Sequence, residues 1–279
     1  MPLMEHLREL RVRMFRSILA IFVGMVLGYI FYEQIFAVLK QPFESGLQSL
    51  LAGGNEVDAS LNLVGSPGLA FILQLKTSLV AGIVIASPIW LWQAWAFVVP
   101  ALRQKERFWS VVFAAISGPL FISGIAVGYW VLPKGLEILI GFTPGGLDNL
   151  VSINDYINFV LRMLLVFGIA FEIPLFVVLL NLAGVVTGKQ LGSARAWIII
   201  GTFVFAAIGT PSTDPISMLF LAVPMTLLFL ISEVIARLVD RRRKRSSGED
   251  FDAYADDEAS PLHIDRRPED ERPSSIDDT

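Results

Sequence analysis

One acidic side chain of this protein lies deep inside an apolar stretch, and it is the first candidate for chemistry. Glu172 stands in the run Phe167-Gly168-Ile169-Ala170-Phe171-Glu172-Ile173-Pro174. A carboxylate at the middle of a bilayer costs about 2.5–3.5 kcal/mol even on the lenient insertion scale. Pro174 removes one backbone hydrogen bond, which frees the carbonyl of Ala170 and permits a bend. We therefore expect Glu172 to face a protein interior, a watery cavity or a partner helix, or to be protonated. A structural hydrogen bond to another helix is the simpler alternative.

Two further carboxylates stand in strongly basic segments. Glu9 lies in Leu7-Arg8-Glu9-Leu10-Arg11, and Glu106 lies in Leu102-Arg103-Gln104-Lys105-Glu106-Arg107. Taken alone, these segments favour internal salt bridges with Arg11 or Arg107, which stabilise little when exposed. The functional alternative is that carboxylates beside a membrane accept bidentate hydrogen bonds from the guanidinium groups of a ligand.

The rest of the chain excludes most classes of active site. It has no cysteine, which excludes disulfides and thiolate metal sites. Its two histidines, His6 and His263, are remote from every apolar stretch. It lacks the phosphate-binding, dinucleotide-binding, zinc-hydrolase and serine-hydrolase motifs. We therefore expect no catalytic residue, no metal and no cofactor, and we do not expect an enzyme.

The elements that position these side chains are transmembrane helices. The chain is 54% hydrophobic and only 17% charged, whereas soluble proteins are about 25% charged. Residues 77–99 and 108–133 contain no Asp, Glu, Lys or Arg. Each of these segments exceeds the roughly 20 residues that an α-helix needs to cross about 30 Å of hydrocarbon. The sequence therefore predicts an all-α membrane protein.

The positions of Lys and Arg predict the topology. Segments rich in these residues alternate with segments that have few, and the last apolar stretch is followed by the basic run 241–245. Basic flanks stay on the cytoplasmic side of a membrane. This predicts six transmembrane helices with both termini in the cytoplasm, at about 17–36, 69–98, 108–132, 157–183, 195–209 and 215–235. The last two are short, so we expect them to thin the bilayer locally or to be sheltered by a partner.

This topology divides the chain into three segments. Residues 1–16 form a cytoplasmic amphipathic segment, and residues 17–238 form the membrane domain. Residues 239–279 form a basic flank and an acidic tail, which from residue 246 holds 12 acidic residues and three arginines. That composition is typical of disorder. The outer connection 33–68 contains several large apolar residues, so we expect a packed cap rather than a flexible loop.

Several residues at the ends and faces of these helices have structural interpretations. Trp90, Trp92 and Trp95 are expected to form an aromatic belt at the cytoplasmic interface. Lys76 and Arg162 lie near the outer edges and are expected to extend to the headgroups as anchors. The run from Gly124 to Gly128 has the GxxxG spacing, which is more often ordinary helix packing than a specific motif.

Four separated motifs occur in a characteristic order. They are the amphipathic start His6-Leu7-x-Glu9-Leu10-Arg11-x-Arg13, the stretch 95–102 followed by Glu106-Arg107, the run 167–174, and Thr210-Pro211 ahead of Asp214. In this order on six predicted spans, they closely resemble the TatC family, the multispanning core of the twin-arginine protein translocase. The resemblance covers about residues 3–238 and leaves out the acidic tail.

The resemblance implies a fold and a set of site residues. TatC-like proteins form a cupped six-helix bundle whose outer loops make a cap, where Pro42 matches a family proline. Two cytoplasmic glutamates, here Glu9 and Glu106, face the paired arginines of a signal peptide, and Arg11 and Phe97 belong to the same region. Glu172 matches an intramembrane acid on the concave face. Thr210 and Asp214 lie where single-span TatA/TatB-type partners dock, although Met218 stands where the family often has glutamine.

The resemblance also implies a function without chemistry. The chain is expected to be the receptor for twin-arginine signal peptides of folded proteins, in a bacterial cytoplasmic membrane. It is expected to organise TatA/TatB-type subunits and further copies of itself for export driven by the proton-motive force. No nucleic acid partner is expected. The alternative is a proton-coupled small-molecule transporter that uses Glu172, and a flux assay in proteoliposomes without a protein substrate would discriminate the two.

Overall fold

The computed structural model describes residues 3–53, 59–63, 65–102, 107–143, 149–209 and 215–247. Three residues singled out above, Glu106, Thr210 and Asp214, lie outside the described residues, as does the acidic tail from residue 248. The elements follow in the order α1 (Leu3–Ile30), α2 (Tyr32–Ala52), β1 (Ala59–Asn62), α3 (Leu69–Ile85), α4 (Ser87–Leu102), α5 (Arg107–Gly141), β2 (Asn149–Ser152), α6 (Ile153–Ala170), α7 (Ile173–Leu182), α8 (Gly188–Ser193), α9 (Arg195–Gly209) and α10 (Pro215–Ser247).

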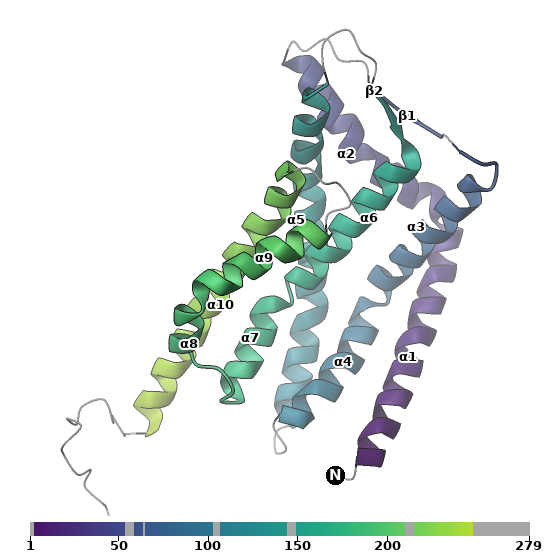
Figure 1. Cartoon of the computed structure of the whole chain (residues 1–279). Helices are drawn as coiled ribbons and strands as arrows, with labels where there is room; N and C mark the ends of the chain where they lie inside the picture. Colours follow the sequence, from purple (N-terminus) through teal and green to yellow (C-terminus); the bar gives the residue numbers. More distant parts are fainter. Residues whose placement is uncertain are drawn as a thin grey trace, which may run out of the picture.

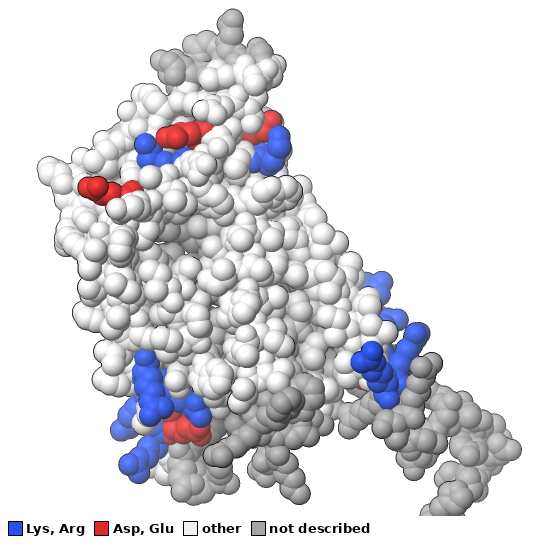
Figure 2. Space-filling view, turned by 180° about the vertical axis from the view of Figure 1, so that it is seen from behind, with Lys and Arg blue, Asp and Glu red and all other residues white. Residues whose placement is uncertain are grey.

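Apolar helices of membrane-spanning length make up most of this structure. By length and composition the segments Val111–Gly141, Ile153–Leu182 and Met218–Arg242 can each cross a bilayer. Two bent pairs qualify when each is taken as one span, namely α1 with α2 and α3 with α4, and α9 supplies a shorter apolar helix. Figure 2 shows the charged side chains gathered toward the two ends of the molecule, with a wide uncharged band between them. This band has the character that a helix bundle needs to be soluble in hydrocarbon.

The first long helix ends earlier than the hydropathy suggests. α1 stops at Ile30, and α2 leaves it at an angle of 81°, whereas the apolar pattern predicts a span to residue 36. The reason lies in packing: Leu39, Phe43 and Leu50 on one face of α2 are buried in the main core. Burying these side chains requires α2 to turn across the ends of α5 and α6 (Figure 1).

Pro42 sits in the interior of α2, and a tyrosine of α5 compensates for its effect. A helix proline has no N–H to offer the carbonyl four residues before it, here Val38. The hydroxyl of Tyr129 on α5 donates to that Val38 oxygen at 2.9 Å. The hydroxyl of Tyr156 on α6 donates to the next carbonyl, that of Leu39, at 2.6 Å. Pro42 therefore creates the acceptor through which α5 holds α2.

A short parallel sheet joins the two connections beside α2. Ala59 pairs with Asn149, and the register continues to Asn62 with Ser152. Both strands lie at the same end of the molecule as α2 (Figure 1). The purely helical prediction omits this sheet, because a four-residue pairing between segments far apart in sequence leaves no local pattern.

Two other predicted spans are each broken into two helices. α3 and α4 meet at Ala86 with a bend of 57°. α6 and α7 are separated by Phe171 and Glu172, with Pro174 in the first turn of α7. The second break agrees with the position of the proline, which cannot continue the hydrogen-bond ladder of the helix before it.

The glycines of the GxxxG run are packing residues. A Cβ atom added to Gly124 would lie 2.6 Å from the backbone oxygen of Phe167, and one added to Gly128 would lie 2.9 Å from the Phe167 ring. α5 and α6 therefore approach closely along this face, and Phe167 is buried in the core. The structure supports the packing interpretation of this spacing.

The last two helices differ in length. α9 has 15 residues, which corresponds to about 22 Å along its axis at 1.5 Å per residue. α10 has 33 residues and continues through the basic run as far as Ser247. The expectation that both helices are short is therefore wrong for α10, because Lys and Arg are good helix formers and extend the last helix beyond its apolar part.

A glycine contact between α1 and α3 provides the first prediction. A Cβ on Gly82 would press against the backbone nitrogen of Met25 and lie 2.8 Å from its Cα. Backbone atoms cannot rotate away, so Gly82→Ala is expected to destabilise the purified protein by about 1–3 kcal/mol, measured as a lower melting temperature. Gly201→Ala is the matched control, because a Cβ there meets nothing within 4 Å. Equal melting temperatures for the two variants would contradict this packing.

Candidate functional site

One arginine joins the N-terminal part of α1 to α4. Arg13 donates to Glu9 Oε1 from Nε at 2.9 Å and from Nη2 at 2.6 Å. Its third nitrogen, Nη1, lies 3.4 Å from Gln93 Oε1 on α4. The salt-bridge partner of Glu9 is thus Arg13 and not Arg11, because residues four apart are neighbours on a helix whereas residues two apart are not. Within the described part of the chain, Glu9 Oε2 accepts no hydrogen bond.

The surroundings of Glu9 form a shallow hollow of about 310 Å³. It is lined by Arg8, Glu9, Val12, Arg13 and Arg16, all from one face of α1. Arg11 is exposed on a different face and does not line this hollow.

Phe97 lies one helical turn beyond Gln93 on α4, so it shares the face that meets Arg13. The structure therefore brings Glu9, Arg13 and Gln93 together. It does not bring Arg11 beside Glu9, and it does not describe Glu106.

Glu172 occupies the break between α6 and α7 and faces α4. The indole nitrogen of Trp95 donates to Glu172 Oε2 at 3.3 Å. The second oxygen, Oε1, is buried without a hydrogen-bond partner among the described residues. Apolar side chains of α4, α5 and α7 pack around Trp95, including Phe113, whose ring centroid is 5.6 Å away. The structural hydrogen bond considered above is present, and one acceptor on the same carboxylate stays unused.

The expected tryptophan belt is therefore only partly correct. Trp95 is 7% exposed, and its indole donates a hydrogen bond to Glu172. The indole of Trp90 donates to the carbonyl of Ile83 at 2.9 Å. Trp92 is exposed, as a residue at an interface should be. Buried indoles need an acceptor for their N–H, and the two breaks in the spans supply acceptors that the sequence pattern did not reveal.

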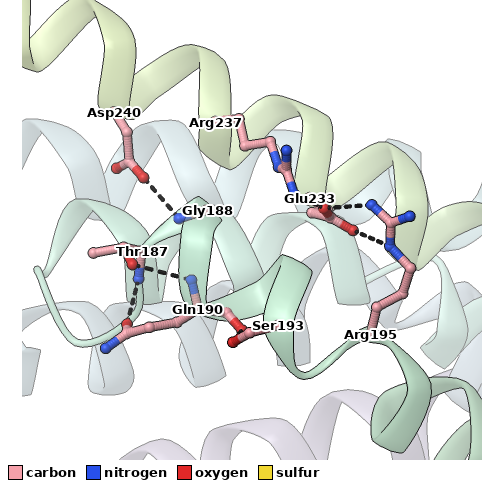
Figure 3. Close-up of polar contacts among 8 residues, drawn as sticks. All are labelled: Thr187, Gly188, Gln190, Ser193, Arg195, Glu233, Arg237 and Asp240. Atoms are coloured by element: carbon pink, nitrogen blue, oxygen red, sulfur yellow. Dashed lines mark hydrogen bonds and ion pairs between the residues drawn. The ribbon is translucent and has the colours of Figure 1, made fainter.

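A second ionic cluster escaped the sequence analysis. Glu233 on α10 is 2% exposed and receives two hydrogen bonds from Arg195 on α9, at 3.0 and 2.8 Å. Arg237, one turn further along α10, lies 2.6 Å from Glu233 Oε1. Figure 3 shows the carboxylate held between the two guanidinium groups. The signal that could have found it is an acid four residues before an arginine in the last apolar stretch.

The connection before α9 is tied to the same helix. Asp240 accepts from the backbone nitrogen of Gly188 and from the Asn181 amide, each at 2.7 Å. Thr187 and Gln190 form a capping box at the start of α8. A Cβ on Gly188 would lie 2.6 Å from the Arg237 side chain. Together with Glu233, these contacts fasten α7, α8 and α9 to α10 (Figure 3).

The described residues hold no group of three or more His, Cys, Asp and Glu side chains that could bind a metal ion. The three sites built around Glu9, Glu172 and Glu233 each hold one carboxylate paired with cations or with an indole. Such groups can bind and orient charged ligands.

Comparison with known proteins identifies the family. The model of the family "Sec-independent protein translocase protein (TatC)" matches residues 5–224. The chain belongs to the TatC family. The TatC of Frankia casuarinae is 42% identical over 96% of this chain and 74% of that protein. The TatC of Aquifex aeolicus is 37% identical over 88% of this chain and 98% of that protein.

A solved structure agrees with this assignment. The crystal structure of the twin-arginine translocase receptor TatC in the detergent DDM superposes with a TM-score of 0.71 at 36% identity, and it covers 83% of this chain and 99% of that one. The predicted family and the helical membrane architecture are confirmed, and the chain is a component of a protein translocase rather than an enzyme. Membership of TatC implies other Tat subunits and exported substrates as partners. The transporter alternative thereby loses its support.

Proposed function

We propose that this TatC protein is the receptor for twin-arginine signal peptides and that Glu9 is one of its two binding carboxylates. The observation that carries the proposal is the state of Glu9: one oxygen is held by Arg13, while the other accepts no hydrogen bond from the described residues. Arg13 in turn is anchored to α4 through Gln93. Such a carboxylate is pre-oriented to receive one guanidinium group of a ligand.

The arrangement of the ends supports a cytoplasmic site. The start of α1 and the basic end of α10 lie at the same end of the molecule, opposite α2 and the small sheet (Figure 1). Basic segments remain on the cytoplasmic side, so we assign both termini to the cytoplasmic side of a bacterial plasma membrane. The six crossings are α1, α3 with α4, α5, α6 with α7, α9, and α10. α2 and the sheet then form the outer cap of a cupped bundle.

The remaining site residues complete the receptor. Glu106 supplies the second carboxylate, Phe97 offers an apolar contact beside the paired arginines, and Arg11 contributes from the neighbouring face of α1. Glu172 marks the concave face between α4 and α7, where its unpaired oxygen suits a proton or a polar group of the translocating chain. α9, α10 and the turn with Thr210 and Asp214 provide the docking region for single-span TatA/TatB-type subunits. Export is driven by the proton-motive force in an assembly of several copies.

Site-specific photo-crosslinking tests the receptor. A photoreactive residue at position 12, where Val12 lines the hollow beside Glu9 and its replacement leaves that carboxylate in place, is expected to crosslink to a signal peptide with paired arginines. The yield should drop at least about tenfold when both arginines are replaced by lysine, because a point charge does not reproduce the bidentate fork. Crosslinking that is indifferent to this replacement would refute the assignment of Glu9.

Glu172→Ala provides the control in the same assay. It removes a carboxylate remote from the N-terminal end of α1, so the Arg-Arg crosslink at position 12 should persist while export of a folded substrate falls. Normal export with both Glu172→Ala and Glu172→Gln would remove Glu172 from the mechanism.

A further inference from the structure

A cavity of about 460 Å³ lies between α5 and α6 at the end of the molecule covered by α2. Its volume is in the range of about 300–1,000 Å³ that is typical of small-molecule sites. One side of its lining is apolar, with Phe43 of α2 and Leu136 and Ile140 of α5. The other side presents Asp155, Asn158 and Arg162 of α6. A site with one apolar wall and one charged wall suits an amphiphile.

The charged wall retains unused hydrogen-bonding capacity. Arg162 is exposed and makes no ion pair or hydrogen bond with the described residues. Asn158 accepts from Lys76 at 3.4 Å through its oxygen, which leaves its amide N–H groups available. Among the described residues, Asp155 accepts a hydrogen bond only from the side-chain amide of the neighbouring Asn154, at 3.4 Å.

Asp155 and Arg162 stand two turns apart on the same side of α6, so a cation and an anion face one cavity without neutralising each other. The Tyr156 hydroxyl, which also borders the cavity, is already bonded to Leu39.

The depth of Arg162 places this wall at a membrane surface. From Arg162 to the end of α7 at Leu182 the chain runs about 20 residues, which corresponds to about 30 Å of helix and equals the thickness of the hydrocarbon core. Arginine side chains on helices point back toward the helix N-terminus, here toward Asp155 and the headgroup layer. The cavity therefore opens at the level where phosphate groups of lipids reside.

We propose that this cavity binds the headgroup of a zwitterionic phospholipid. Arg162 and the Asn158 amide hold the phosphate, Asp155 holds the headgroup ammonium, and the glycerol and first methylene groups cover Leu136 and Ile140. The carboxylate of Asp155 disfavours a lipid or free ion that carries only negative charge. Such a lipid would join α5 to α6 beneath α2. The proposal uses the membrane orientation of the proposed function, in which this surface faces outward, but it is independent of the signal-peptide site.

Native mass spectrometry of the full chain in detergent tests the proposal. The probes are dihexanoyl-phosphatidylethanolamine, dihexanoyl-phosphatidylglycerol and inorganic phosphate. The ethanolamine lipid is expected to bind best. Arg162→Gln should weaken its binding about tenfold, which is the loss of one charge-assisted contact. Asp155→Asn should remove the preference for ethanolamine over glycerol while the glycerol lipid binds at least as well as before.

The controls separate the possible ligands. Lys134→Gln removes a cation near the C-terminal end of α5, which is paired with Glu137 and does not line this cavity, and it should leave lipid binding unchanged. Unchanged binding in Arg162→Gln would overturn the site. Equal or tighter binding of the glycerol lipid to the unaltered protein would overturn the role of Asp155. If inorganic phosphate bound as tightly as the ethanolamine lipid, the cavity would be a simple anion site. That result would overturn the assignment of a phospholipid as its ligand. Crosslinking of the signal peptide from position 12 is a separate readout, so failure here leaves the receptor proposal standing.

Discussion

Replacing both Arg195 and Arg237 by alanine is expected to lower the melting temperature of the purified protein by on the order of 10 °C. Glu233 is 2% exposed, and these two guanidinium groups are its cationic partners among the described residues. Removing both guanidinium groups leaves the Glu233 carboxylate without the charge-assisted hydrogen bonds that hold it between α9 and α10, which costs more than the ion pair itself contributes. The two arginines are each about half exposed, so they tolerate the loss of Glu233 better than Glu233 tolerates their loss.

A third substitution separates charge from packing. Adding Glu233→Gln to the double variant should recover part of the lost stability, because a neutral amide is cheaper to bury than a carboxylate. Lys134→Ala is the control for an ordinary ion pair, since Lys134 is 70% exposed in its contact with Glu137, and it should change the melting temperature little. A double variant that melts like the unaltered protein, or a triple variant less stable than the double one, would contradict the buried-charge argument.

The double variant Glu9→Ala with Glu106→Ala is expected to abolish measurable binding of an Arg-Arg signal peptide. Each charge-assisted bidentate contact accounts for about tenfold or more in affinity, so the loss of both should exceed about 100-fold. A fluorescent signal peptide titrated into detergent-solubilised protein measures this directly. Retained binding within threefold would show that the peptide is held elsewhere.

Two variants control this experiment. Glu44→Ala removes a carboxylate that also pairs with a cation four residues away on a helix, at 3.6 Å to Lys40, but at the opposite end of the molecule, so binding should be unchanged. Arg13→Gln releases Glu9 from its internal partner. If Arg13 competes with the peptide, this variant should bind the Arg-Arg peptide more tightly than the unaltered protein, and weaker binding would assign Arg13 to positioning Glu9.

The two acidic candidates that the structure describes, Glu172 and Glu9, differ in how well the sequence predicted their surroundings. Glu172 was recognisable because a lone carboxylate between apolar residues is costly in a bilayer, and Pro174 beside it correctly predicted a break. Its partner Trp95 was wrongly predicted to lie at the membrane interface. The orientation of its side chain depends on a hydrogen-bond acceptor on another helix, here Glu172, which the sequence does not reveal. Glu9 was recognisable only as a candidate, because an isolated sequence cannot show which of several arginines pairs with it.

The ionic cluster on α10 was missed for a related reason. Glu233 stands beside Ser232 near a basic segment, where a carboxylate is easily taken for a solvated flank. Its 2% exposure arises because α9 folds back against α10 and brings Arg195, 38 positions away, onto it. The apolar length of a short helix such as α9 is not enough by itself to hold it in a membrane. The ion pair between Arg195 of α9 and Glu233 of α10 attaches α9 to the longer helix.

The sequence by itself determined the class of this protein, the separation of its charged and apolar segments and its family. These properties follow from the cost of placing charges and unpaired backbone groups in hydrocarbon, which is local along the chain. Only the tertiary structure decided that α2 turns away from α1, that two tyrosines satisfy carbonyls near Pro42, that β1 pairs with β2, and that Glu233 is buried. Each of these depends on contacts between residues far apart in sequence, whose energies no local pattern encodes.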